Sequence, residues 1–228
     1  MKRATYICFE GTEGVGKTTQ TQKLVDHLRA QGFKVLQTKE PGTSHLPLTM
    51  VLRAIMLDKQ YDEQLTIPAR EFISQAIRSI HIEKLVIPAL EEYDYIIQDR
   101  GILSGLAYGH VCGNDLADIG ELTRIVTTPA IGKLESSFYD SIIYLKGDTS
   151  AGLKKALQSK KEFAAGDAME SKGNSFLQSV SSNMDELSNS FNTVRISVDG
   201  KNIEEVFSEI LHVLNIGESI DGKSKKGE

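Results

Sequence analysis

A short apolar run, YICF, leads directly into the stretch FEGTEGVGKTTQT, which spans Phe9 to Thr21. Gly11 and Gly16 frame four residues here, and Lys17 and Thr18 follow, which is the pattern G-x-x-x-x-G-K-[ST]. Glycines let consecutive backbone N–H groups approach anionic oxygens without a side chain in the way. The pattern requires a strand before this turn and a helix after it, and the positive end of that helix also attracts an anion.

This stretch predicts a phosphate-binding loop for a nucleoside triphosphate. Lys17 provides a mobile positive charge for the outer phosphates, and the hydroxyl of Thr18 suits Mg²⁺. A GTP-binding switch would also need a guanine-reading loop such as Asn-Lys-x-Asp, and the sequence has none. We therefore take the ligand to be ATP. The predicted ATP-binding residues are Gly11, Thr12, Glu13, Gly14, Val15, Gly16, Lys17, Thr18 and Thr19.

Apolar segments alternate with amphipathic ones along the chain. Strands are predicted at 6–9, 34–38, 93–98, 141–146 and 193–198. Helices are predicted at 18–32, 46–57, 68–92, 102–126, 149–161, 173–190 and 202–214. Strands that alternate with helices predict a parallel, doubly wound sheet.

The composition narrows the setting in which the protein acts. A net charge of −5 argues against a general nucleic-acid binder, which usually carries a basic excess. Cys8 and Cys112 have no metal-ligand neighbourhood, and we expect no disulfide between them. We see no secretory signal and no apolar run as long as a membrane span. We therefore expect a cytoplasmic protein with no nucleic-acid or membrane partner.

Three further stretches resemble a known family. TKEPGT, from Thr38 to Thr43, follows the second strand, and QDRGILSGLAYG, from Gln98 to Gly109, follows the third; the long helix carries Arg78. With the loop, they resemble the thymidylate kinase family, which makes dTDP from dTMP and ATP. The family pattern is a phosphate-binding loop, then Arg-Glu-Pro-Gly-Gly-Thr, then Asp-Arg-[aromatic or His]-x-x-Ser-x-x-Ala-Tyr. The resemblance covers about 5–214 and is most specific in the first half.

The resemblance implies a role for each matching residue near the phosphates. Arg53 and Arg100 would clamp the acceptor phosphate, because a planar guanidinium pairs with phosphate oxygens and keeps its charge. Lys17 and Arg100 would stabilise charge on the transferred group, since phosphoryl transfer depends on alignment and charge neutralisation. The implied catalytic residues are Lys17, Arg100, Glu13 and Asp99, and the implied metal ligands are Thr18 and Asp99.

The resemblance also assigns the sugar and the base of the acceptor. Glu13 would contact the sugar or its water, and Tyr108 would lie against the 2′ position and favour deoxyribose. Arg78 would hydrogen-bond the base, and Ser104 would lie near it. Taken singly, Arg53 and Arg78 also fit solvated helix surfaces, and Tyr108 fits a core. The implied substrate-binding residues are Glu40, Pro41, Arg53, Ser74, Arg78, Arg100, Ser104 and Tyr108.

The sequence departs from the family in the acceptor motifs. Lys39 and Thr43 stand where the family has arginine and a second glycine. Ser74 stands where the family has a phenylalanine that stacks on thymine, and Phe72 lies about 200° further round the helix. Losing a stacking ring removes roughly 1–3 kcal/mol of base affinity. Ser74 and Gln75 offer hydrogen bonds to a base with other edge groups, so the base specificity stays open.

The lid expected at about 154–172 also departs from the family pattern. The family lid ends in Asp-Arg-x-Glu, and here 167–170 reads DAME, with alanine in place of arginine. The local positive charges are Lys154, Lys155, Lys160 and Lys161. Lysine lacks the planar fork of arginine. Either one of these lysines takes the arginine's place, or they form a solvated helix face and the enzyme is slow.

The sequence predicts an α/β protein with the P-loop NTPase fold: a five-stranded parallel sheet, helices on both faces and a lid segment. One domain over 1–215 would precede a disordered tail at 216–228. The favoured function is phosphorylation of a deoxynucleoside monophosphate, most of all dTMP, by ATP with Mg²⁺. The resemblance also implies a homodimer that uses helices around 50–57, 72–90 and 102–125.

Three alternatives stay open. The first is a kinase for dUMP, dGMP or a 5-modified pyrimidine nucleotide. The second is a deoxynucleoside kinase, which the Glu40-Pro41-Gly42 motif disfavours because a nucleoside has no phosphate to clamp. The third is a nucleotide-binding module without catalysis, which the missing lid arginine supports.

Overall fold

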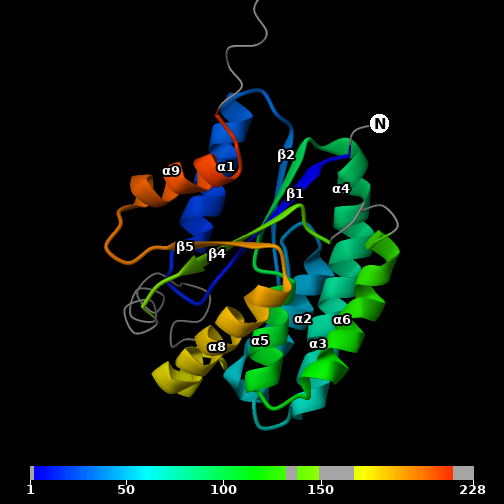
Figure 1. Ribbon diagram of the computed structural model, residues 1–228. Helices are drawn as coiled ribbons and strands as arrows, with labels where there is room; N and C mark the ends of the chain where they lie inside the picture. The colour runs from blue at the N-terminus through cyan, green and yellow to red at the C-terminus, as the bar shows by residue number, and fades with distance from the viewer. Residues whose placement is uncertain (1–2, 132–137, 149–166, 218–228) are drawn as a thin grey trace, which may run out of the picture.

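Five parallel strands form a single sheet in the order β2-β3-β1-β4-β5 (Figure 1). The structure is a computed structural model and describes residues 3–131, 138–148 and 167–217. The strands are β1 (Thr5–Glu10), β2 (Val35–Lys39), β3 (Tyr95–Asp99), β4 (Ser141–Lys146) and β5 (Thr193–Ser197). All five strand predictions are confirmed. The inner strands β1, β3 and β4 are mostly buried apolar runs, whereas the edge strands β2 and β5 bury only part of their residues.

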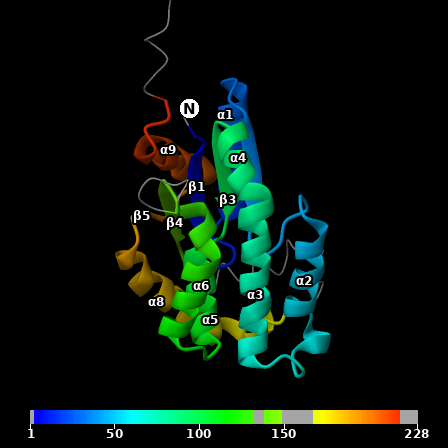
Figure 2. The same ribbon diagram turned by 90° about the vertical axis from the view of Figure 1, so that its right-hand side faces the viewer.

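Helices cover both faces of the sheet (Figures 1 and 2). They are α1 (Lys17–Ala30), α2 (Pro47–Leu57), α3 (Ile67–His81), α4 (Ile87–Glu92), α5 (Ile102–Val111), α6 (Leu116–Ile131), α8 (Gly173–Leu187) and α9 (Ile203–Val213). Side chains alternate along β1: Ile7 and Phe9 pack with α1 and α9, whereas Tyr6 and Cys8 pack on the other side with α4, α5 and α6. The sheet therefore lies between two apolar layers.

Two helix predictions are corrected in detail. The predicted helix at 68–92 comprises α3, a π-helical turn (Ile82–Val86) and α4, which begins just before Pro88. The predicted helix at 102–126 is two helices, α5 and α6. Gly113 ends the first with a φ of 108°, and Asp115 accepts the backbone N–H groups of the second helix's start. The stretch CGND at 112–115 carries this turn signal in the sequence, and the single predicted helix passed over it.

Other expectations lie partly beyond the described residues. The helix predicted at 149–161 lies outside them, as do the four lid lysines and 218–228 of the tail. The domain limits stay predictions, although Ile216 packs on the apolar layer beside α1 and α9. Within the described ranges, no helix is both long and apolar enough to cross a membrane. Both cysteines are described, and both are free thiols.

The parallel sheet brings the three sequence motifs to one edge. Asp99 at the end of β3 pairs in register with Phe9 of β1 and with Lys39 of β2. The phosphate loop, the EPGT turn and the Asp-Arg pair therefore leave the sheet side by side at its carboxyl edge. Ligands of open α/β sheets bind at this edge.

Candidate active site

A cleft of about 760 Å³ runs along the carboxyl edge of the sheet. It is lined by most of the residues predicted from the sequence: Glu13, Gly14, Val15, Gly16, Lys17, Thr18, Thr19, Glu40, Pro41, Arg53, Ser74, Arg78, Asp99, Arg100, Ser104 and Tyr108. Gly11 and Thr12 are the two predicted residues that do not line it. They lie behind the loop, where their carbonyls accept hydrogen bonds from Arg100 and Lys17.

The phosphate loop is shaped by left-handed glycines and a buried lysine. Gly14 and Gly16 have φ values of 72° and 93°, which only glycine adopts without strain. The Lys17 ammonium folds back and donates to the Thr12 carbonyl over 2.5 Å. Burial and the neighbouring Arg100 charge lower the pKa of Lys17 to about 8. A phosphate at this loop would offset that burial and keep Lys17 protonated.

Thr18 and Asp99 meet as the sequence predicts for a metal-binding pair. The Thr18 hydroxyl donates to Asp99 Oδ2 over 2.7 Å. The other carboxylate oxygen, Oδ1, is buried and makes no hydrogen bond to any described residue. Oxygen ligands of this kind suit Mg²⁺, which usually takes one or two protein ligands and completes its shell with phosphates and water. Over the described residues, no cluster of three or more His, Cys, Asp or Glu side chains gathers to hold a metal.

Arg100 lies between the phosphate loop and α5 in a left-handed backbone conformation, with a φ of 64°. Its guanidinium donates to Gly11 O at 2.9 Å, to Ser104 Oγ at 3.1 Å and to Glu13 Oε1 at 2.6 Å. Burial alone would lower its pKa, but the acidic groups around it, Glu13 first among them, together outweigh burial, and the pKa of Arg100 is raised. Arg100 is therefore a fixed positive charge at the centre of the cleft.

Glu13 joins Arg100 to Tyr108. The Tyr108 hydroxyl donates to Glu13 Oε2, and the Arg100 guanidinium lies 5.5 Å from the centre of the Tyr108 ring. Burial and the Glu13 carboxylate raise the pKa of Tyr108 well above its usual value. The structure thus brings together three residues that the resemblance assigned to the phosphate and the sugar.

Glu40 is the centre of a buried polar cluster behind the EPGT turn. Its carboxylate accepts from Arg78 Nε at 3.0 Å and contacts His81 Nδ1 at 3.1 Å, while His81 Nε2 contacts the Thr38 hydroxyl at 2.9 Å. Burial favours the neutral acid, but Arg78 and His81 hold the pKa of Glu40 below its ordinary value. Arg53 donates to the Pro41 carbonyl over 2.8 Å, so both arginines stabilise this turn.

Glu10 is a site residue that the sequence analysis missed. Its buried carboxylate accepts from Gly101 N at 2.9 Å, Ser104 N at 3.1 Å and the Ser104 hydroxyl. These groups belong to the first turn of α5, whose N-cap position, Gly101, has no side chain to cap it. A carboxylate from β1 therefore caps the helix that carries Ser104 and Tyr108. The sequence shows only an acidic residue after an apolar run.

Gly101 also departs from the family motif, which has an aromatic residue or histidine at this position. A Cβ at Gly101 would lie 2.1 Å from the Tyr139 hydroxyl and 3.0 Å from Cys8 Sγ. Tyr139 comes from just before β4 and fills this space itself. The position is therefore closed to a larger side chain.

The second missed feature is a wall at the other end of the cleft. Val198, Lys201, Asn202, Ile203 and Val206 line it, after β5 and along the first turn of α9. They face the phosphate loop from the side opposite the acceptor motifs. Generic turn and apolar residues form this wall, and only their place after the fifth strand could have indicated it.

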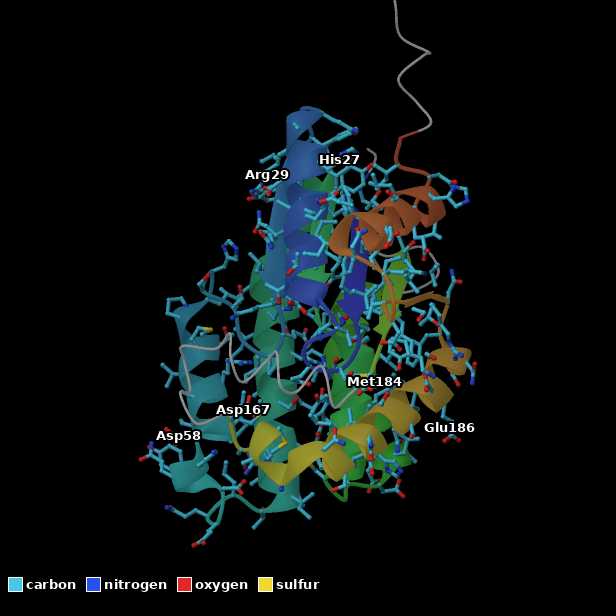
Figure 3. The ribbon with its side chains drawn as sticks, turned by 90° about the vertical axis from the view of Figure 1, so that its left-hand side faces the viewer. His27, Arg29, Asp58, Asp167, Met184 and Glu186 are labelled. Atoms are coloured by element: carbon cyan, nitrogen blue, oxygen red, sulfur yellow. The ribbon has the colours of Figure 1, made fainter. Side chains whose placement is uncertain are left out.

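The end of the predicted lid is described from 167 onward. Asp167 and Met169 line the cleft, and Ala168 N donates to the Leu57 carbonyl at the end of α2 over 2.9 Å. Figure 3 shows Asp167 on the same side of the molecule as Asp58, which follows α2. The alanine of the DAME stretch is buried against α2, so its position offers no charge to the cleft.

Fold and site together define a class. A phosphate-binding loop, a Thr–Asp pair suited to Mg²⁺ and a separate arginine-lined subsite in one cleft are the parts of a P-loop phosphotransferase with two nucleotide subsites.

Comparisons with known proteins identify the family within this class. The family model for thymidylate kinase matches residues 9–210. The chain is 31% identical over 209 residues to the thymidylate kinase of Finegoldia magna, covering 92% of this chain and 97% of the relative. It is 37% identical over 162 residues to that of Geotalea daltonii, covering 71% of each. The thymidylate kinase structure from Ehrlichia chaffeensis shares the fold, with a TM-score of 0.67 at 22% identity, covering 93% of this chain and 99% of that one.

The chain belongs to the thymidylate kinase family of nucleoside monophosphate kinases. The resemblance inferred from the sequence and the P-loop fold are confirmed.

We predict that Glu10→Ala weakens both the fold and the site. The N–H groups of Gly101 and Ser104 lose a buried acceptor, which costs about 1–3 kcal/mol. Glu10→Gln keeps an acceptor oxygen and is the matched control. Urea unfolding, followed by circular dichroism, measures both; equal stability of the two variants would contradict the capping role.

The buried Glu10 carboxyl also predicts a pH dependence of stability, which a comparison of the native protein with Glu10→Gln measures. Burial raises the pKa of Glu10 above its ordinary value of 4.5. Its contribution to stability is therefore fully present below pH 4.5 and is lost as the pH rises through the raised pKa. Relative to Glu10→Gln, the native protein should lose stability over that interval.

Proposed function

We propose that the protein transfers the γ-phosphoryl group of ATP to dTMP to give dTDP. The observation that carries the proposal is the position of Arg100. It is anchored on the phosphate loop through the Gly11 carbonyl and on the acceptor side through Ser104. A single guanidinium would therefore lie between the donor and acceptor subsites, where charge develops during phosphoryl transfer.

The donor end would be held by the phosphate loop. Lys17 and the loop N–H groups would bind the outer phosphates, with the α1 N-terminus behind them. The wall formed by Val198–Val206 would pack against the nucleoside of ATP. Mg²⁺ would be held through Thr18 and Asp99, and when bound it would neutralise phosphate charge.

The acceptor end would be held by arginines. Arg53 and Arg100 would clamp the monophosphate, which competes with the Glu13 carboxylate for Arg100. Tyr108 would lie along the sugar, and Arg78 and Ser74 would face the base. Holding both phosphates in line with their charges neutralised is the main task of such a site.

We further propose that the lid closes over ATP and excludes water, and that the protein acts in the reducing cytoplasm.

The direct test is release of ADP from Mg·ATP with a panel of acceptors: dTMP, dUMP, dCMP, dGMP, dAMP, their ribose counterparts and free thymidine. We expect selective turnover of dTMP. Turnover of another deoxynucleotide in place of dTMP would mean that the protein's substrate carries a different base. ATP binding without any turnover would support a non-catalytic module and overturn the proposal.

In the same assay, Lys17→Ala should abolish turnover while the circular dichroism spectrum stays unchanged. The variant loses the charge that stabilises the transferred phosphoryl group. Full activity in this variant would show that the Lys17 charge takes no part in the reaction and would contradict the assignment of the phosphate loop.

We predict that Arg100→Ala raises the KM for the monophosphate at least tenfold and the KM for ATP much less. The physical reason is that Arg100 is assigned to the acceptor phosphate, whereas the loop N–H groups and Lys17 hold ATP. Steady-state kinetics in both substrates measures the split. Arg29→Ala is the control, because Arg29 lies at the far end of α1 from the loop (Figure 3). Equal increases for both substrates would contradict the assignment.

We also propose that the protein is a homodimer through α2, α3 and α6. These helices lie side by side in Figure 2 and carry large exposed apolar side chains: Leu48, Val51, Ile55, Ile67, Phe72 and Ile125. Such a gathering of apolar surface is typical of an interface. Sedimentation equilibrium should give the mass of two chains, and Phe72→Glu should shift it towards one. Phe33→Glu, in the turn after α1, should not; a native mass of one chain would refute the dimer.

A further inference from the structure

One face each of α3 and α5 bounds the acceptor end of the cleft. From α3, Glu71, Ser74 and Arg78 line it, and from α5, Gly105 and Gly109 do. Spacings of three, four and seven residues place each set along a single helix face. This is the part of the cleft in which the base of the acceptor would lie.

Two glycines one turn apart let α3 side chains lie directly on the backbone of α5. A Cβ at Gly105 would be 2.3 Å from Arg78 Nη2, and a Cβ at Gly109 would be 2.7 Å from Glu71 Oε2. The guanidinium and the carboxylate therefore occupy the volume that side chains at these positions would fill. The Arg78 guanidinium, a hydrogen-bond donor, and the Glu71 carboxylate, an acceptor, thus lie on the same wall of the cleft, which α3 and α5 form.

Gln75 fixes this donor and this acceptor relative to each other. Its Nε2 donates to Glu71 Oε1 at 2.7 Å and to the Thr123 hydroxyl of α6 at 3.0 Å. Its Oε1 accepts from Arg78 Nη1 at 3.2 Å. Gln75 is buried and lies behind the wall, so it does not itself reach a base, contrary to the option that the sequence left open.

Glu71 has one oxygen committed to Gln75 and one facing the wall of the cleft. Within the described part of the chain, Oε2 makes no hydrogen bond, and the residue as a whole is only 6% exposed. Burial raises the pKa of this carboxyl, and Gln75 and Arg78 partly offset that effect. A carboxylate oxygen in a largely buried residue at a ligand site is stabilised by an N–H donor from the ligand.

We propose that Glu71 accepts a hydrogen bond from the ring N–H of the substrate base, while Arg78 donates to the adjacent ring carbonyl. The inference rests on the proposed function and names the feature that the base must carry. Thymine and uracil present a carbonyl at C4 beside N3–H, which complements this pair. Cytosine presents an amino group beside an unprotonated N3. The lone pair of N3 would face a lone pair of the Glu71 carboxylate, and the two would repel each other. Glu71 is thus a specificity residue for keto pyrimidines.

The test compares dTMP with 5-methyl-dCMP, which has the same shape and the opposite edge. In the native protein we expect dTMP to be strongly favoured in kcat/KM. Glu71→Leu should lower that preference roughly ten- to hundredfold, the worth of a hydrogen bond to a charged group. Glu71→Gln, whose amide can accept or donate, should also relax the preference and keeps the polar contact with Gln75. Glu83→Leu removes an exposed carboxylate just after α3 and should leave the preference unchanged.

The ratio of kcat/KM for dTMP to that for 5-methyl-dCMP distinguishes a role of Glu71 in base recognition from a purely structural role. A purely structural role for Glu71 would lower turnover of both nucleotides equally, and an unchanged ratio in both variants would overturn the inference while dTMP kinase activity stands. If the native protein turns over no dTMP, the proposed function fails by itself. Calorimetric binding of the same two nucleotides then decides the inference, which is overturned if the native protein binds neither or if Glu71→Leu leaves their affinity ratio unchanged.

Discussion

The backbone N–H of Arg100 donates to the carbonyl of Phe9 over 2.8 Å, and the site depends on this bond. It extends the β1–β3 pairing past the end of the sheet and brings the Asp-Arg pair against the start of the phosphate loop. The left-handed conformation of Arg100 then turns its side chain back over Gly11. Such a backbone costs free energy and persists only where surrounding contacts fix it, which the Glu10 cap of α5 does here.

The same arrangement explains how a chain of net charge −5 can bind two nucleotides. Four of its cationic groups, Lys17, Arg53, Arg78 and Arg100, converge on one cleft from separate elements. Three of them are buried or nearly so and are held by the carboxylates Glu13 and Glu40 or by backbone carbonyls. In the proposed function, bound phosphates would replace part of this internal compensation.

Sequence reasoning succeeded where residue type and local context suffice. The inner strands are mostly buried apolar runs, and the phosphate loop combines glycines with a lysine, so both could be predicted. It failed where partners are far apart in sequence. The donors that bond to the Glu10 carboxylate lie beyond residue 100, and the linking role of Gln75 depends on its contacts with both Arg78 and Thr123. The roles assigned by resemblance stay predictions, although their residues gather in one cleft.

The paired glycines of α5 have a consequence for how this family member can change. Because Arg78 and Glu71 occupy the space beside Gly105 and Gly109, substitutions on the two helices are not independent. A larger residue at Gly105 is tolerated only if Arg78 moves or shortens, and the same holds for Gly109 and Glu71. Mutations across this wall should therefore show epistasis, and new base preferences would be reached through paired changes.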